Sequence, residues 1–149
     1  AKGIAGGLPF GGVMANERCR NVFTPGTHGT TFGGNPVSAA AACYVLDRID
    51  DALLEQVKEK GAYIRQAVEA MNLPCLGKTR GLGLMIGVEV KGEKTNRELA
   101  AALIENGLLC LTAGPGLRFL PPLVITREEI DQALAIIQST LSQFKGVQA

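Results

Sequence analysis

A lysine at the start of the chain stands beside an unusual number of glycines. Lys2 is followed by the segment GIAGGLPFGG. A lysine that forms a Schiff base must first lose its proton, and desolvation or nearby cations can lower its pKa enough for this. The glycines would let the backbone come close to a flat cofactor without side-chain clashes. By composition alone, such a lysine is also an ordinary solvated loop residue.

A second segment, GTHGTTFGGNP at residues 26–36, combines hydroxyl groups with the expected start of a helix. Asn35 is a favourable helix cap, and Pro36 would occupy the first helical position, where proline is tolerated. Free amide donors and the helix dipole favour an anion at such a place. The alternative is a capped turn with no ligand. His28, the single histidine of the chain, is interpreted as a loop residue that shapes this turn.

Two further segments contain an arginine among apolar residues and glycines. Arg118, in GLRFLPP, could bind a carboxylate through two parallel hydrogen bonds, or could be a surface residue at a strand edge. Arg80 precedes GLGLMIG, whose glycine spacing does not fit a dinucleotide-binding loop. We therefore reject a dinucleotide site. We predict that Arg80 is structural and that the glycines of this segment allow close packing.

Four segments follow one another in a fixed order: AKGIAGGLPFGGVMA, GTHGTTFGGNP, RGLGLMIGVE and GLRFLPPLVIT. Together they resemble the class III pyridoxal-phosphate aminotransferases, and the THGTT and FGGNP segments are most similar to the acetylornithine aminotransferases of that class. The resemblance covers essentially all 149 residues. It implies an α/β fold, the C-terminal part of a transferase of fold type I, with a short, mostly antiparallel sheet covered by helices. The implied cofactor is pyridoxal 5'-phosphate.

The resemblance also implies roles for individual residues. Lys2 matches the lysine that holds the cofactor and then moves a proton as general acid and base. Thr31 matches the threonine that binds the cofactor phosphate, and Thr30 the neighbouring position that contacts substrate. Arg118 matches the arginine that binds a substrate carboxylate. Because both threonines reach into the partner's active site in this family, a homodimer is implied.

The implied reaction is amino transfer between N-acetylornithine and 2-oxoglutarate in arginine biosynthesis, in the cytoplasm. Ornithine, succinylornithine and 4-aminobutyrate are the alternative amine donors. A hypothesis of another class is that the 149-residue chain is a non-catalytic folding or dimerisation module. The chain begins with Ala1 directly before Lys2, which suggests a piece of a longer protein. The family's other cofactor-binding groups lie upstream of this lysine, so we expect the isolated chain to be inactive.

Composition excludes several other classes of protein. Fifteen basic residues nearly balance fourteen acidic ones, without a basic block interleaved with aromatics, so we expect no nucleic-acid partner. No apolar run approaches the roughly 20 residues that a membrane span needs. The four cysteines, Cys19, Cys43, Cys75 and Cys110, are widely spaced and form no CxxC pair. With a single histidine, this pattern favours reduced thiols over a metal site.

Periodicity and capping patterns predict four helices. The first runs from Pro36 to about Ile49. The second follows Asp50 and has an apolar face made of Leu54, Val57, Gly61, Ile64, Val68 and Met71. Thr95 with Glu98, and Thr126 with Glu129, have the spacing of capping boxes and each predict a helix start. The helix after Thr95 should end near Gly107, and that after Thr126 has an apolar face of Ile130, Leu134, Ile137, Leu141 and Phe144.

Short β-rich runs predict strands at residues 73–76, 84–90, 108–111 and 117–120, with a further short strand around Val13 to Ala15. Helices should cover one face of the resulting small sheet. The composition changes near residue 50. We therefore predict that residues 1–50 are the end of a large cofactor-binding domain, and that residues 51–149 form a small C-terminal α/β domain with its connecting helix.

Overall fold

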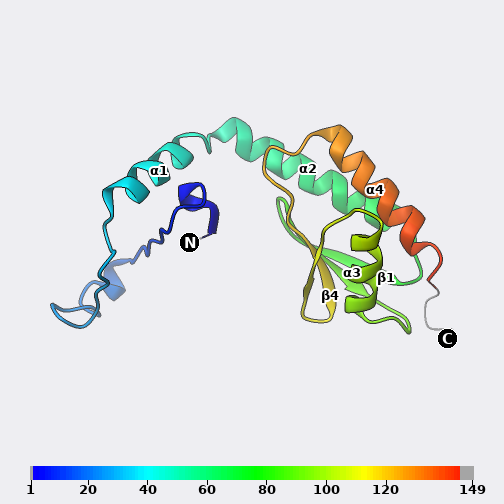
Figure 1. Cartoon of the computed structure of the whole chain (residues 1–149), viewed down its shortest axis with the longest axis horizontal. Helices are drawn as coiled ribbons and strands as arrows, with labels where there is room; N and C mark the ends of the chain where they lie inside the picture. The colour runs from blue at the N-terminus through cyan, green and yellow to red at the C-terminus, as the bar shows by residue number, and fades with distance from the viewer. Residues whose placement is uncertain (1, 145–149) are drawn as a thin grey trace. The chain divides into compact units, whose positions relative to one another are not determined.

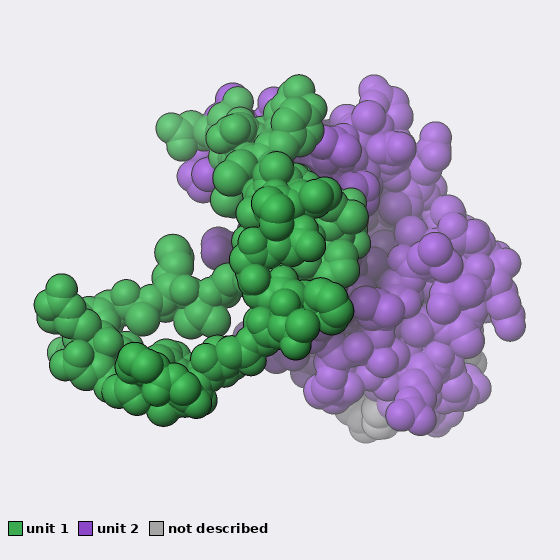
Figure 2. Space-filling view, turned by 60° about the vertical axis from the view of Figure 1, so that its left-hand side comes forward, with its two compact units in different colours: residues 1–51 green, residues 52–149 purple. Residues whose placement is uncertain are grey.

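The computed structural model describes residues 2–144, and the chain divides after Asp51 into two units (Figure 2). Residues 1–51 belong to the first unit and residues 52–149 to the second. The first unit contains mainly turns and short helices. The second contains the sheet and most of the buried side chains.

The first unit is built around one regular helix, α1 (Pro36–Asp47). The Asn35 side chain caps it by accepting hydrogen bonds from the backbone N–H groups of Val37 (3.0 Å) and Ser38 (3.1 Å). Helix α1 packs against the short 3-10 helix η1 (Lys2–Ala5), and a second 3-10 turn, η2 (Glu17–Cys19), lies between them in the sequence. The predicted capped helix is therefore confirmed, and it ends two residues before the expected Ile49.

The strand predicted around Val13 to Ala15 is wrong. This segment has no regular structure, and the side chains of Val13 and Met14 are 89% and 100% exposed. A short apolar run becomes a strand only when a neighbouring strand pairs with it, and none does so here. The segment instead links η1 to η2 as an exposed loop.

Three helices form one layer of the second unit: α2 (Asp51–Ala70), α3 (Asn96–Glu105) and α4 (Arg127–Leu141). Both predicted capping boxes are present, with the threonine hydroxyl accepting from the backbone of the glutamate and the carboxylate accepting from the backbone of the threonine. The three predicted helices are thus confirmed. On α2 the apolar face is buried from Gly61 to Val68, whereas Leu54 is 43% exposed.

The second layer is a four-stranded sheet made of β1 (Leu76–Leu82), β2 (Met85–Val90), β3 (Leu111–Ala113) and β4 (Gly116–Phe119). The strand order is β1-β2-β4-β3, and every neighbouring pair is antiparallel. The small antiparallel sheet covered by helices is therefore confirmed. The segment RGLGLMIG, which resembled a nucleotide loop only in its glycines, is the hairpin that joins β1 to β2.

Two of the predicted strands are displaced. The first was placed at residues 73–76, but residues 74 and 75 form a turn, and β1 begins only at Leu76. The other was placed at residues 108–111, but the N–H of Leu108 donates to the carbonyl of Leu103 (2.9 Å) and so closes the end of α3. Strand pairing starts at Leu111, opposite Arg118 on β4.

The core lies between the sheet and the three helices (Figure 1). Alternate strand residues, Ile86 and Val88 on β2 and Leu117 on β4, are at most 1% exposed and pack with side chains from all three helices. The helical contribution comes from Ile64, Val68, Leu99, Leu103, Ile130, Leu134, Ile137 and Leu141. Because strand side chains alternate between faces, residues such as Gly87 and Arg118 lie on the opposite face of the sheet.

Within residues 2–144, no helix is both long enough and apolar enough to cross a membrane.

Candidate functional site

Lys2 opens the 3-10 helix η1 with an unusual backbone conformation. Its φ angle is +61°, in the left-handed region that residues other than glycine seldom adopt. The side chain is exposed, and its amine has no hydrogen-bond or ion-pair partner in the described part of the chain. A Cβ added to Gly3 or Gly7 would meet no atom within 4 Å, so the backbone beside Lys2 borders open space. The backbone beside this amine therefore leaves room for a flat cofactor to approach.

Thr30 and Thr31 lie in the turn that precedes α1. The carbonyl of Thr30 accepts a hydrogen bond from the N–H of Gly33 (3.2 Å), which closes the turn. Both threonines are exposed, and among residues 2–144 neither hydroxyl has a partner. The hydroxyls are thus free to donate to an anion. His28, in the same loop, lies with its ring centroid 5.7 Å from that of Phe23, in line with a role in shaping the loop.

Arg118 lies on β4, between the buried Leu117 and the half-buried Phe119. It is the last of three residues that lie in one row across the sheet. Arg80 on β1 is paired with Gly87 on β2, and Gly87 is paired with Arg118 on β4. Both arginines are exposed, and neither guanidinium has a hydrogen-bond or ion-pair partner within residues 2–144. From the sequence, Arg118 is a candidate carboxylate-binding residue and Arg80 is predicted to be structural. Only the pairing of the strands places the two arginines in one row.

The four predicted site residues are divided between the two units. Lys2, Thr30 and Thr31 belong to the first unit, and Arg118 belongs to the second. Each is exposed within the chain. The groups that would hold a cofactor are therefore gathered in the first unit, and the group that would bind a carboxylate is in the second.

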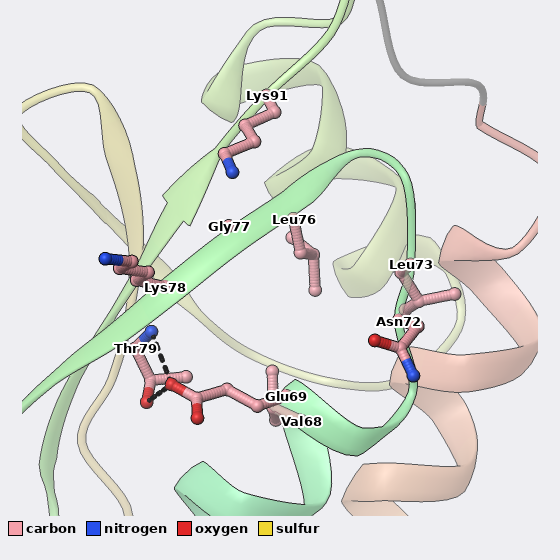
Figure 3. Close-up of a pocket in the computed structure, with 9 residues that line it drawn as sticks. All are labelled: Val68, Glu69, Asn72, Leu73, Leu76, Gly77, Lys78, Thr79 and Lys91. Carbon is pink, nitrogen blue, oxygen red and sulfur yellow. Dashed lines mark hydrogen bonds between the residues drawn. The ribbon is translucent and has the colours of Figure 1, made fainter.

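An open cavity of about 450 Å³ lies elsewhere, between the end of α2 and the edge strand β1 (Figure 3). Glu69 points toward β1, where its carboxylate accepts hydrogen bonds from Thr79, from the backbone N–H (3.0 Å) and from the hydroxyl (2.6 Å). These bonds hold the pKa of Glu69 below its usual range. The carboxylate therefore serves to fasten the edge strand to α2, and none of the predicted site residues lines this cavity.

The cysteines show no arrangement for metal binding. Within residues 2–144, no group of three or more histidine, cysteine or acidic side chains could hold a metal ion. All four cysteines are free thiols, two of them exposed. Burial raises the pKa of both Cys75 and Cys110, which favours the neutral thiol.

The comparisons with known proteins agree on one family. The sequence profile described as class-III aminotransferase matches residues 1–141. The acetylornithine aminotransferase of Aquifex aeolicus is 43% identical over 142 residues, which cover 95% of this chain and 36% of that protein. The chain thus spans about a third of the length of the relatives it matches.

Solved structures support the same relationship. The acetylornithine aminotransferase of Elizabethkingia anophelis is similar with a TM-score of 0.75 at 36% identity, over 88% of this chain and 36% of that one. The ornithine aminotransferase of Toxoplasma gondii, whose active site holds PLP at partial occupancy, has a TM-score of 0.72 at 36% identity, over 81% of this chain and 30% of that one. The chain belongs to the class-III aminotransferase family.

Proposed function

We propose that the protein containing this chain is a pyridoxal-phosphate aminotransferase that transfers an amino group between N-acetylornithine and 2-oxoglutarate. The observation that carries the proposal is the setting of Lys2, an exposed amine without a partner in residues 2–144, beside a glycine-rich segment in a member of the class-III family. Similarity to acetylornithine aminotransferases of several organisms, at 42% to 43% identity, supports this choice of amine donor. An ornithine aminotransferase is 44% identical, which makes ornithine the second candidate donor.

In this proposal each site residue has one task. Lys2 would hold the cofactor through its side-chain amine, and the same amine would then move a proton as general base and general acid. The Thr31 hydroxyl donates a hydrogen bond to the cofactor phosphate, and Thr30 contacts substrate. Arg118 binds a substrate carboxylate through two parallel N–H···O bonds, which fix its orientation. The bound cofactor supplies the electron sink that stabilises negative charge on the substrate carbon.

The remaining parts of the proposal concern the whole protein. Residues 1–50 would be the end of the large cofactor-binding domain, and residues 51–149 the small C-terminal domain with its connecting helix. The protein would act as a cytoplasmic homodimer in arginine biosynthesis, in which Thr30 and Thr31 complete the active site of the partner subunit. The exposure of both threonines within one chain is in keeping with such a role.

The covalent role of Lys2 can be tested by trapping the cofactor. The full-length protein would be reduced with borohydride and digested, and the peptides mapped. We expect the phosphopyridoxyl label on Lys2, and we expect it to disappear in Lys2→Ala but to persist in Lys91→Ala, which removes an exposed lysine from the second unit. A label on Lys78 or Lys91 in the unaltered protein would refute the assignment.

The choice of substrate can be tested by steady-state rates of the full-length protein with each amine donor and 2-oxoglutarate. We expect the largest kcat/KM for N-acetylornithine. A clear preference for ornithine would favour the second candidate, and a strong preference for 4-aminobutyrate would contradict both.

A further inference from the structure

Arg80, Gly87 and Arg118 stand side by side on the face of the sheet that the helices of the second unit leave open. The register pairs Arg80 with Gly87 and Gly87 with Arg118. The alternate residues Ile86 and Val88 point into the core. Because neighbouring strands are about 4.8 Å apart, the Cα atoms of the two arginines are separated by roughly two such spacings, or about 10 Å.

Gly87 allows the side chain of Arg80 to lie across β2. A Cβ added to Gly87 would be 3.3 Å from both Cγ and Nε of Arg80, which is tighter than ordinary contact. The Arg80 side chain therefore extends from β1 over Gly87, in the direction of β4 and Arg118. A Cβ at position 87 would require this side chain to shift by a few tenths of an ångström, and a larger residue would require more.

The two guanidinium groups lack a counter-charge in the described part of the chain. Glu89 lies on the same face of β2, but its carboxylate accepts from the N–H of Lys78 (3.2 Å) and lies 4.0 Å from Nζ of Lys91. Two cations held in one row repel each other, and an anion bound between them removes this cost. The arrangement is thus suited to an acidic ligand.

Apolar side chains flank the arginine row. Leu82 and Met85 form the next pair of β1 and β2 residues on this face, and their side chains are 86% and 60% exposed. Leu111 is paired with Arg118 on the other side of the row and is 57% exposed. Exposed apolar side chains beside two guanidiniums fit a ligand that has a carboxylate at the end of a short hydrocarbon chain. A dicarboxylate such as 2-oxoglutarate has this chemistry.

We propose that Arg80 is a second carboxylate-binding residue, which acts with Arg118 across Gly87 to bind one carboxylate of the dicarboxylate substrate. This inference rests on the proposed function, and it gives Arg80 a binding role in place of the structural one predicted from the sequence. Arg118 supplies the two-pronged bond, and Arg80 supplies a further charge-assisted hydrogen bond from the β1 side. Gly87 keeps the space between them free of side chains.

The test uses the full-length enzyme with three variants. Arg80→Gln should raise the KM for 2-oxoglutarate about tenfold, as expected for the loss of one charge-assisted hydrogen bond, with a smaller effect on kcat. Gly87→Ala should raise the same KM, because it displaces Arg80 without removing a charge. Arg97→Gln, the matched control, removes another exposed arginine, from α3, and should leave all constants unchanged.

Two further measurements separate binding from a structural role. Glutarate is an unreactive dicarboxylate, and its dissociation constant can be measured by calorimetric titration. In Arg80→Gln this constant should rise by the same factor as the KM for 2-oxoglutarate. The Tm of this variant should stay unchanged or rise, because one of two like charges is removed. A fall in Tm of several degrees with unaltered glutarate binding would show that Arg80 is structural and would overturn the inference.

The inference and the proposed function can fail separately. If the unaltered enzyme transfers no amino group to 2-oxoglutarate, the proposed function is wrong. If it does so, and Arg80→Gln binds 2-oxoglutarate and glutarate normally, only the role of Arg80 is wrong. In an Arg118→Lys background, Arg80→Gln should have a smaller effect than alone, since both arginines hold one carboxylate; fully additive effects would contradict a shared ligand.

Discussion

Single glycines set how closely α2 approaches the β1–β2 hairpin. A Cβ on Gly61 of α2 would overlap the carbonyl oxygen of Gly83 in the hairpin turn. Arg65, one turn further along the helix, donates from Nη1 to the same oxygen (3.2 Å). Gly83 itself has φ +52°, and a Cβ there would lie 2.7 Å from Val57. The hairpin that presents Arg80 therefore depends on two glycines in close contact.

Gly61→Ala tests this contact. In an isolated helix the change would stabilise by up to about 1 kcal/mol, because alanine is the better helix former. Here we expect the free energy of unfolding to fall by about 1 to 3 kcal/mol, since the added methyl group must push the hairpin away. Urea unfolding of the 149-residue chain would measure the effect.

The control for this substitution is Gln66→Ala on the exposed side of the same helix, which should change stability by no more than about 0.5 kcal/mol. A Gly61→Ala chain as stable as the original, or more so, would show that the hairpin adjusts without cost.

At the scale of elements, the capping boxes of α3 and α4 tie each helix start to a glutamate. Glu98 accepts hydrogen bonds from Nζ of Lys94 (2.8 Å) and from the backbone N–H of Thr95 (2.8 Å). The bond from Lys94, followed by that from the Thr95 backbone, lowers the pKa of Glu98 to about 2. The start of α3 is thus held by a carboxylate that stays ionised well into the acid range.

This shift predicts how stability depends on pH. The pKa of Glu98 in the folded chain is below the ordinary glutamate value of 4.5, so the stabilisation is complete above about pH 4.5 and is lost as the pH falls toward about 2. Glu98→Gln, which still accepts a hydrogen bond but does not titrate, should flatten the fall in Tm over this window. Thermal unfolding between pH 2 and 6 would measure it.

Glu105→Gln, at the other end of α3, is the matched control and should leave the pH profile unaltered. A profile that is equally steep in Glu98→Gln and in the unaltered chain would assign the acid sensitivity to other groups.

At the scale of the whole molecule, the two units differ sharply in how much they bury. In the described part of the first unit, the buried residues are Ala5, Ser38 and Ala42, while Phe32 is 83% exposed. The second unit contains the continuous apolar core between sheet and helices. Since buried apolar area supplies most of the folding free energy, stability should be concentrated in the second unit.

Amide hydrogen exchange on the isolated 149-residue chain would test this difference. We expect strong protection in the sheet and in α2, α3 and α4, and little within residues 2–35. The same chain should show no turnover with N-acetylornithine, because the resemblance places the family's other cofactor-binding groups upstream of Lys2, outside these 149 residues. Strong protection throughout residues 2–35 in a monomer, or measurable turnover, would contradict this prediction.

The sequence by itself determined the helices and the family. Asn35 with Pro36, Thr95 with Glu98, and Thr126 with Glu129 each act within four residues, so their effect can be predicted without knowing the fold. Short motifs were enough to indicate the class-III aminotransferases, namely those around Lys2, in residues 26–36 and around Arg118. The match of the family profile to residues 1–141 confirmed this membership.

Only the tertiary structure decided where the strands begin and which residues share a face. Leu111 starts β3 because it is paired with Arg118, and Val13 forms no strand because no neighbour pairs with it. Arg80 and Arg118 are far apart in the sequence, but their strands β1 and β4 both pair with β2. In this register Gly87 of β2 lies between the two arginines, so all three residues form one row. Helix ends depend on local hydrogen bonds, whereas strands depend on partners distant along the chain, and that is why the helices were predictable and the arginine row was not.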